Sequence, residues 1–166
     1  MGTDGGGINI LDPTTGNITV LEHISGDNHS LPTNTILCLH SDSAGNIWAG
    51  SKREGVINIR EVSMRTYTNV VLGHNKGLSQ STVLQLYQEP ASEELWIATD
   101  GGGINKFIPS TETFVHYPDT WGDKMVSITG FTPNELLVSA FSKGIFIFDK
   151  KTGKKRPFAI MSPSLE

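Results

Sequence analysis

The chain has 166 residues, enough to bury a core of its own, and a net charge of −4 from 17 acidic and 13 basic side chains. This balance provides no basic face for nucleic acid, and the single cysteine, Cys38, excludes an intramolecular disulfide and a four-cysteine zinc site. No apolar run reaches the roughly 20 residues of a membrane helix and no signal-peptide pattern opens the chain, so we predict no membrane contact for this segment.

Residues 3–23 are predicted to form a turn followed by two strands. Asp4 to Gly7 supplies glycines that can adopt positive φ at a hairpin tip, and Asp12 to Asn17 contains the Pro and Gly of a second turn. The two predicted strands are residues 8–11 and 18–21. The chain is therefore expected to begin with the two outer strands of a four-stranded unit.

Three complete units of four strands are predicted along the rest of the chain, at residues 35–71, 82–117 and 126–160. The first opens with an apolar run at residues 35–40, which suits an inner strand that is buried on both faces. The predicted strands are 35–40, 47–51, 56–60 and 65–71, then 82–87, 95–99, 104–108 and 113–117, then 126–131, 135–140, 145–148 and 156–160. Residues 1–2 and 165–166 resemble remnants of an expression vector and are left out of the fold prediction.

The units are related by an internal repeat. Residues 100–105, Asp-Gly-Gly-Gly-Ile-Asn, match residues 4–9 letter for letter, 96 positions later. Residues 46–51 mirror residues 94–99 at half that spacing, and a more divergent copy begins at residue 135. A period in the forties that is filled only with strands is typical of propeller blades. The predicted fold is all-β, a partial β-propeller of about three and a half four-stranded antiparallel blades.

A partial propeller has two open ends. Propellers usually close with four to eight blades, and open sheet edges tend to recruit another chain. We therefore expect this chain to self-associate through its open blade edges, with two copies completing a ring of seven or eight blades.

Two motifs resemble a known repeat. Asp-x-x-Gly-Asn-Ile-Trp-Ala-Gly-Ser at residues 42–51 and Leu-Trp-Ile-Ala-Thr-Asp-Gly-Gly-Gly-Ile at residues 95–104 are similar to the two-component regulator propeller repeat, and the resemblance covers almost the whole chain. The last copy departs from the pattern, with Leu137 in place of the tryptophan and residues 141–143 in place of Asp-Gly-Gly. In that family the repeats form the periplasmic sensor region of Bacteroidetes hybrid two-component systems, ahead of a membrane helix, a histidine kinase, a receiver and a DNA-binding domain.

The resemblance implies a non-catalytic, ligand-sensing propeller segment in the periplasmic part of an inner-membrane protein. Its ligand would be an oligosaccharide or similar glycan, and the signal would pass to a kinase elsewhere in the parent chain. Loops from several rigid blades converge on one face of a propeller. We expect this face to carry the tips between second and third strands and the blade-to-blade connections. The candidate ligand-binding residues there are Arg53, His74, Asp100 and Trp121.

The three tryptophans have different predicted roles. Trp48 and Trp96 occupy the same repeat position inside strands, so we interpret them as packing groups between blades rather than as sugar-stacking platforms. Trp121 has no repeat equivalent and lies in a blade-to-blade connection, which makes it the best candidate for an exposed aromatic contact. The alternative for Trp121 is a ring folded under its own turn.

The sequence gives little support for a phosphate-binding, metal-binding or catalytic site. Gly101, Gly102 and Gly103 are interpreted as hairpin-tip residues rather than a phosphate loop, because such a loop precedes a helix and these glycines lie between strands. The five histidines show no metal-ligand spacing, and no metal, cofactor or catalytic triad is predicted. Two alternative functions stay open: a protein-interaction or dimerisation scaffold without its own ligand, and a propeller lyase or hydrolase, which would need clustered acids, bases or a metal.

Overall fold

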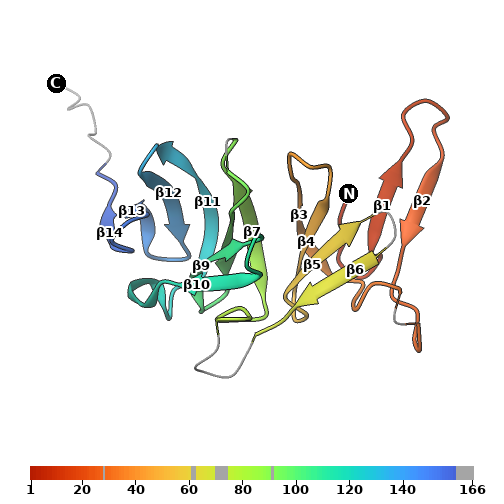
Figure 1. Cartoon of the computed structure of the whole chain (residues 1–166), viewed down its shortest axis with the longest axis horizontal. Coiled ribbons are helices and arrows are strands. Elements are labelled where there is room, and N and C mark those ends of the chain that lie inside the picture. The colour runs from red at the N-terminus through yellow and green to blue at the C-terminus, as the bar shows by residue number, and fades with distance from the viewer. Residues whose placement is uncertain (28, 61–62, 70–74, 91, 160–166) are drawn as a thin grey trace.

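The computed structural model describes residues 1–27, 29–60, 63–69, 75–90 and 92–159. They form four antiparallel sheets, one of two strands and three of four strands, that follow one another along the long axis in chain order (Figure 1). The structure is a partial β-propeller of three and a half blades, which confirms the predicted fold class. Within the described residues the helix η1 (Pro118–Thr120) is a single short turn, and no helix there is long and apolar enough to cross a membrane.

The sheets are named here in chain order as the half-blade and blades 2, 3 and 4. The half-blade contains β1 (Ile8–Leu11) and β2 (Ile18–Leu21). Blade 2 contains β3 (Ile36–Ser41), β4 (Ile47–Ser51), β5 (Val56–Arg60) and β6 (Ser63–Tyr67). Blade 3 contains β7 (Val83–Gln88), β8 (Leu95–Thr99), β9 (Gly103–Ile108) and β10 (Thr113–His116). Blade 4 contains β11 (Met125–Thr132), β12 (Glu135–Ala140), β13 (Gly144–Asp149) and β14 (Lys155–Pro157).

The outermost strands of two blades differ from the prediction. β6 begins at Ser63, two residues earlier than expected, because Ser63 already pairs with Arg60 of β5. It ends at Tyr67, and residues 70–71 of the expected strand lie outside the described residues. β14 covers Lys155–Pro157, so it begins one residue earlier than expected and ends before residues 158–159, while residue 160 lies outside the described residues. Its proline is tolerated because an edge strand needs no donor on its free side.

The core is divided into three apolar clusters, one at each junction between neighbouring sheets. The half-blade and blade 2 share Ile8, Leu31, Ile36, Ala49 and Ile57. Blades 2 and 3 share Trp48, Val56, Val83, Leu86, Leu95, Ile97, Phe107 and Phe114. Blades 3 and 4 share Trp96, Ala98, Ile104, Met125, Ile128, Leu136, Val138 and Phe148.

Each complete blade therefore has two faces that can pack against a neighbouring sheet. We call the face toward the next blade in chain order the forward face, and the face toward the preceding blade the backward face. Successive side chains of a strand point to opposite faces, so Trp96 lies on the forward face of blade 3 while Ile97 lies on its backward face. Strand β8 is consequently buried along its whole length.

A hydroxyl group closes the hairpin tip between the second and third strands in three of the four units. The side chains of Thr3, Ser51 and Thr99 each donate a hydrogen bond to the carbonyl oxygen of the glycine four residues later, at 3.0, 3.0 and 2.8 Å. In blade 4 the corresponding pair is Ala140 and Gly144, and alanine has no hydroxyl to donate. The divergent copy thus keeps the strand pairing and loses this bond.

Candidate functional site

One end of the blades forms a rim of hairpin tips and blade-to-blade connections, which we call the loop face. The tip of blade 2 is tied to the following connection, since the backbone N–H of Gly55 donates to the carbonyl oxygen of Ser81 at 2.9 Å. The tip of blade 3 is tied to the same connection, where the N–H of Asp100 donates to the Thr82 carbonyl oxygen at 3.0 Å. Each tip is therefore held by the chain beside it.

The connection from blade 3 to blade 4 is anchored by Thr120, whose side chain is fully buried. Its hydroxyl accepts a hydrogen bond from the N–H of Ile104 at 2.9 Å and donates to the carbonyl oxygen of Tyr117 at 2.7 Å. Pro118 opens the 3-10 turn, where a fixed φ is favourable. Trp121 directly follows Thr120. Its backbone N–H donates to the Pro118 carbonyl oxygen at 3.0 Å, so the backbone of Trp121 is fixed at the end of this turn.

Three of the four candidate residues lie on the loop face. Arg53 is exposed at the tip of blade 2, Asp100 lies at the tip of blade 3, and Trp121 is 48% exposed in the connection to blade 4. Asp100 and Trp121 lie on adjacent segments, because the N–H of Gly122 donates to the carbonyl oxygen of Gly101 at 2.9 Å. Arg53 is one blade away, and His74 lies outside the described residues.

Two further residues join this site. Lys124 forms an ion pair with Asp100, with 3.0 Å between Nζ and Oδ2, and the same ammonium lies 5.7 Å from the ring centroid of Phe141. Phe141 is 65% exposed and donates its backbone N–H to the Lys124 carbonyl oxygen at 2.8 Å. Phe141 had a signal in the sequence, an aromatic residue where residues 4–6 and 100–102 have Asp-Gly-Gly, whereas Lys124 had none. We call Asp100, Trp121, Lys124 and Phe141 the recognition cluster.

A buried carboxylate stabilises the connection that carries part of the recognition cluster. Asp123 is only 2% exposed, and its two oxygens accept hydrogen bonds from Lys143 at the tip of blade 4 and from Lys155 on β14. Partial burial lowers the pKa of Lys155, against the opposing effect of the Asp119 carboxylate. Removing one partner of a buried pair leaves an uncompensated charge, which is strongly unfavourable. Asp123 therefore fixes the connection to blade 4 and is not free to bind a ligand.

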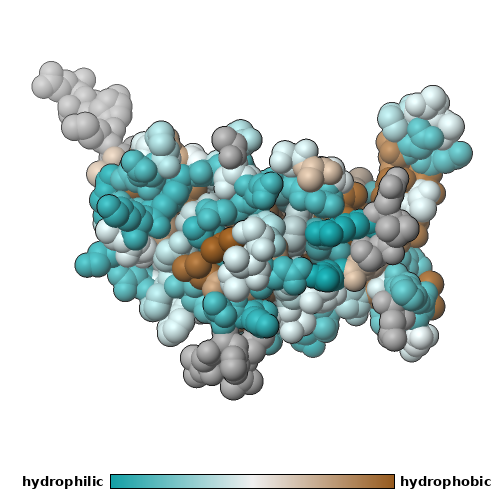
Figure 2. All heavy atoms as spheres, in the orientation of Figure 1, coloured by the Kyte–Doolittle hydropathy of each residue, from teal (hydrophilic) through white to brown (hydrophobic). Residues whose placement is uncertain are grey.

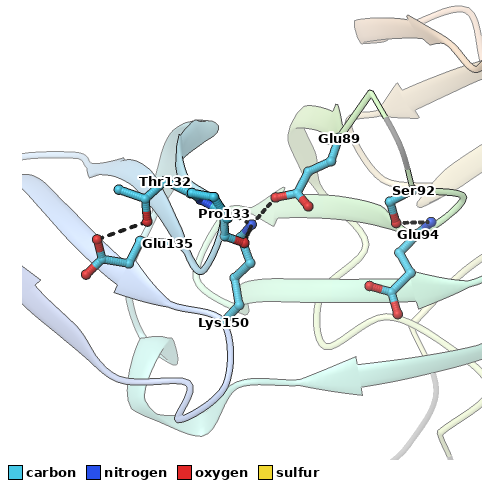
Figure 3. A network of polar contacts seen from close by, with 7 residues as sticks. All are labelled: Glu89, Ser92, Glu94, Thr132, Pro133, Glu135 and Lys150. Carbon is cyan, nitrogen blue, oxygen red and sulfur yellow. Dashed lines mark hydrogen bonds and ion pairs between the residues drawn. The ribbon is translucent and has the colours of Figure 1, made fainter.

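The opposite end of the blades holds structural contacts. Figure 3 shows Lys150 reaching from blade 4 to Glu89 of blade 3, and its ammonium also donates to the Pro133 carbonyl oxygen at 2.8 Å. Between blades 2 and 3 this end contains a cavity of about 190 Å³ bordered by Asp42 and Trp48. Partial burial alone would raise the pKa of Asp42, but hydrogen bonds from groups such as Trp48 Nε1, at 2.9 Å, outweigh it and lower the pKa.

The chemical character of the recognition cluster follows from its side chains. In the part of the chain that the structure describes, no three His, Cys, Asp or Glu side chains come together as possible metal ligands. The cluster offers two exposed aromatic rings, one carboxylate and one ammonium, all on hydrogen-bonded loops of a rigid scaffold.

Comparisons with known proteins agree with the repeat assignment. Residues 30–53 match the family model described as two component regulator propeller. The extracellular domain of the hybrid two component system BT3049 from B. thetaiotaomicron is similar at 23% identity, with a TM-score of 0.68 over 77% of this chain and 19% of that chain. That of BT4673 from the same organism is similar at 20% identity, with a TM-score of 0.57 over 90% of this chain and 27% of that chain. No curated protein matches the sequence.

The likeness extends to a designed protein. The computationally designed protein Ika4 is similar at 16% identity, with a TM-score of 0.59 over 89% of this chain and 82% of that chain. The family match confirms the resemblance predicted from the motif at residues 42–51, and the structural matches show a fold like that of the extracellular regions of two-component sensors. This chain spans only 19% of the BT3049 domain, so the activity of a whole sensor is not carried over to it.

Proposed function

We propose that this chain is a non-catalytic, ligand-recognising segment of an extracytoplasmic β-propeller in a hybrid two-component sensor. Its loop face binds an oligosaccharide or a similar glycan, and the signal passes to a histidine kinase elsewhere in the parent chain. The observation that carries this proposal is the recognition cluster, where exposed Phe141 lies beside the Lys124 ammonium of the Asp100–Lys124 ion pair and exposed Trp121 lies on the adjacent segment. The propeller-repeat match at residues 30–53 supports the same assignment.

The chemistry of the cluster fits a glycan. An aromatic ring is a flat apolar surface that can cover the C–H face of a sugar ring, and Trp121 and Phe141 are 48% and 65% exposed. Asp100 supplies hydrogen-bond acceptors and Lys124 supplies donors for hydroxyl groups. Because side chains of the Asp100–Lys124 pair are 37% and 43% exposed, their mutual attraction is weak, about 0–1 kcal/mol, and both remain available to a ligand.

The proposal is testable by tryptophan fluorescence, because Trp121 is the exposed tryptophan whereas Trp48 and Trp96 are 4% and 2% exposed. Titration with a panel of oligosaccharides is expected to protect Trp121 from acrylamide quenching. In calorimetry with the ligand found this way, Trp121→Ala is expected to raise Kd about tenfold, since an aromatic contact contributes up to about 1.5 kcal/mol. Phe141→Ala is also expected to raise Kd.

The matched control is Val115→Ala, because Val115 is 36% exposed on β10 and lies away from the loop tips. This variant should bind with unchanged affinity. Unchanged affinity in both Trp121→Ala and Phe141→Ala would remove the cluster from consideration. No response to any member of the panel would favour the scaffold function instead.

A further inference from the structure

Lys150 closes the junction of blades 3 and 4 at the end opposite the loop face (Figure 3). It directly follows β13, and its ammonium forms an ion pair with Glu89, which directly follows β7. The same ammonium donates to the Pro133 carbonyl oxygen at 2.8 Å. The Lys150 side chain is only 14% exposed, so this junction encloses a largely buried cation between its two blades.

A second ammonium lies in the same junction. Nζ of Lys106 is 5.6 Å from the centroid of the Trp96 ring and 2.9 Å from Oε1 of Glu94. Glu89 and Glu94 are therefore each paired with a lysine. The two negative and two positive charges of these ion pairs cancel.

The junction of blades 2 and 3 keeps a carboxylate and lacks the first of these lysines. Asp42 directly follows β3, as Glu89 follows β7. Pro109 directly follows β9, as Lys150 follows β13, and a proline ring carries no ammonium. The cavity of about 190 Å³ at this end is bordered by both Asp42 and Pro109. It is thus lined by the counterparts of the two residues that form the ion pair between blades 3 and 4.

The counterpart of the second lysine is a neutral amide. Asn58 pairs with Trp48 at the register where Lys106 pairs with Trp96. Asn58 is 2% exposed, and its Nδ2 has no hydrogen-bond partner among the described residues. Its Oδ1 accepts a hydrogen bond from Nε of Arg60 at 2.9 Å, and Arg60 also borders the cavity. Neither ammonium of the later junction is therefore present in the earlier one.

The cavity is negatively charged. Among the described residues that border it, Asp42 and Glu93 are carboxylates and Arg60 is the cation, so two negative charges and one positive charge leave a net charge of −1. Against the opposing effect of partial burial, hydrogen bonds lower the pKa of Asp42, which therefore stays ionised at neutral pH. Figure 2 shows mainly hydrophilic residues on the surface where blades 2 and 3 meet, a surface that suits a small charged ligand.

We propose that this cavity binds a small primary amine, with the ammonium of the ligand in the role that the Lys150 ammonium has one junction later. Glu93 and Gln88 border the cavity and supply oxygen acceptors for the ammonium. Asp42 acts through its charge, because both of its oxygens already accept hydrogen bonds from its own turn and from Trp48. The Trp48 ring, which also borders the cavity, provides apolar surface for a short carbon chain.

The test is a titration of the intact chain with n-butylamine, which matches a lysine side chain, followed by the tryptophan indole resonances in proton–nitrogen correlation spectra. The Trp48 indole N–H donates to Asp42 Oδ2 at 2.9 Å, so it reports on the cavity, whereas Trp121 reports on the loop face. A saturable shift of the Trp48 resonance is expected, without a shift at Trp121. The neutral analogue n-butanol is expected to bind about tenfold more weakly, because it brings no positive charge.

Pro109→Lys introduces the residue found at the equivalent position of blade 4. Its tethered ammonium is an intramolecular competitor and is expected to raise the Kd for butylamine about tenfold or more. Asn17→Lys adds the same charge on an exposed turn of the half-blade and is expected to leave Kd unchanged. Circular dichroism checks the fold of each variant. Glu93→Gln, which is expected to raise Kd by removing a carboxylate, replaces Pro109→Lys if that variant does not fold.

Three results would each overturn the proposal: no saturable shift at Trp48, equal affinity for butylamine and butanol, or wild-type affinity in folded Pro109→Lys. Unchanged affinity in Glu93→Gln overturns it where that variant is used instead. Because the cavity lies at the end opposite the loop face, either result leaves the oligosaccharide titration of the recognition cluster unaffected.

Discussion

Replacing Trp96 with alanine is expected to lower the free energy of unfolding by about 3–5 kcal/mol, the usual cost of truncating a buried aromatic side chain. Trp96 is 2% exposed and lies between blades 3 and 4. Its ring centroid is 5.6 Å from that of Tyr117 and 6.0 Å from that of Phe148, and the Lys106 ammonium lies 5.6 Å from the ring. Truncation leaves a cavity lined by all three partners, which a sheet junction cannot easily collapse.

Trp121→Ala is the matched control, since the same change is made at a side chain that is 48% exposed. Its expected cost is within about 0.5 kcal/mol, as for most surface substitutions. Urea denaturation followed by circular dichroism measures both values. Equal losses at the two positions would show that Trp96 is not a packing group between blades.

Gly103→Ala is the second change with a large expected effect, about 2–5 kcal/mol of lost stability. Gly103 has φ of 72°, a left-handed conformation that costs an L-residue roughly 1–2 kcal/mol. An added Cβ would also lie 2.1 Å from Thr120 Oγ1 and 2.5 Å from the Thr120 carbonyl oxygen, and overpacking of this kind typically costs about 1–3 kcal/mol. Because Thr120 holds the connection that carries Trp121, the variant should also weaken ligand binding.

Gly101→Ala separates the cost of backbone strain from the cost of overpacking against Thr120. Gly101 also has positive φ, 90°, but an added Cβ there would meet no atom within 4 Å. It is expected to cost only the strain, roughly 1–2 kcal/mol, and to leave the connection in place. Thermal or urea unfolding of the two variants side by side measures the difference. If Gly101→Ala proved as damaging as Gly103→Ala, close packing against Thr120 would not be the reason for the third glycine.

The repeat spacing made much of the fold predictable. Trp48 and Trp96 sit at one repeat position because each fills the junction to the next blade, and such a requirement leaves a periodic trace in the sequence. The outermost strands left a weaker trace, since β6 and β14 pack on one neighbour only and their limits follow the register of β5 and β13. Residues 3, 51 and 99, which carry the hydroxyl at the hairpin tips, also recur at the repeat spacing. Their signal in the sequence is weaker because the residue varies between Thr and Ser.

The recognition cluster was only partly predictable. Asp100 belongs to the repeated motif and Trp121 stood out because it does not, so the sequence indicated both. The pairing of Asp100 with Lys124, and the position of Phe141 over the same ammonium, depend on how a non-repeated connection folds against a divergent tip. Nothing periodic specifies that contact, and local turn chemistry does not determine which side chains meet across two blades.

The face-to-face stacking of blades through the repeated tryptophan position is tested most directly by nuclear Overhauser contacts between aromatic rings. Trp48 and Phe107 come from different blades, and their ring centroids are 5.4 Å apart. Trp96 and Phe148 form the equivalent pair one blade later, at 6.0 Å. The structure predicts cross-peaks between the ring protons of both pairs. Cross-peaks from either tryptophan only to residues of its own sheet would contradict the stacked arrangement.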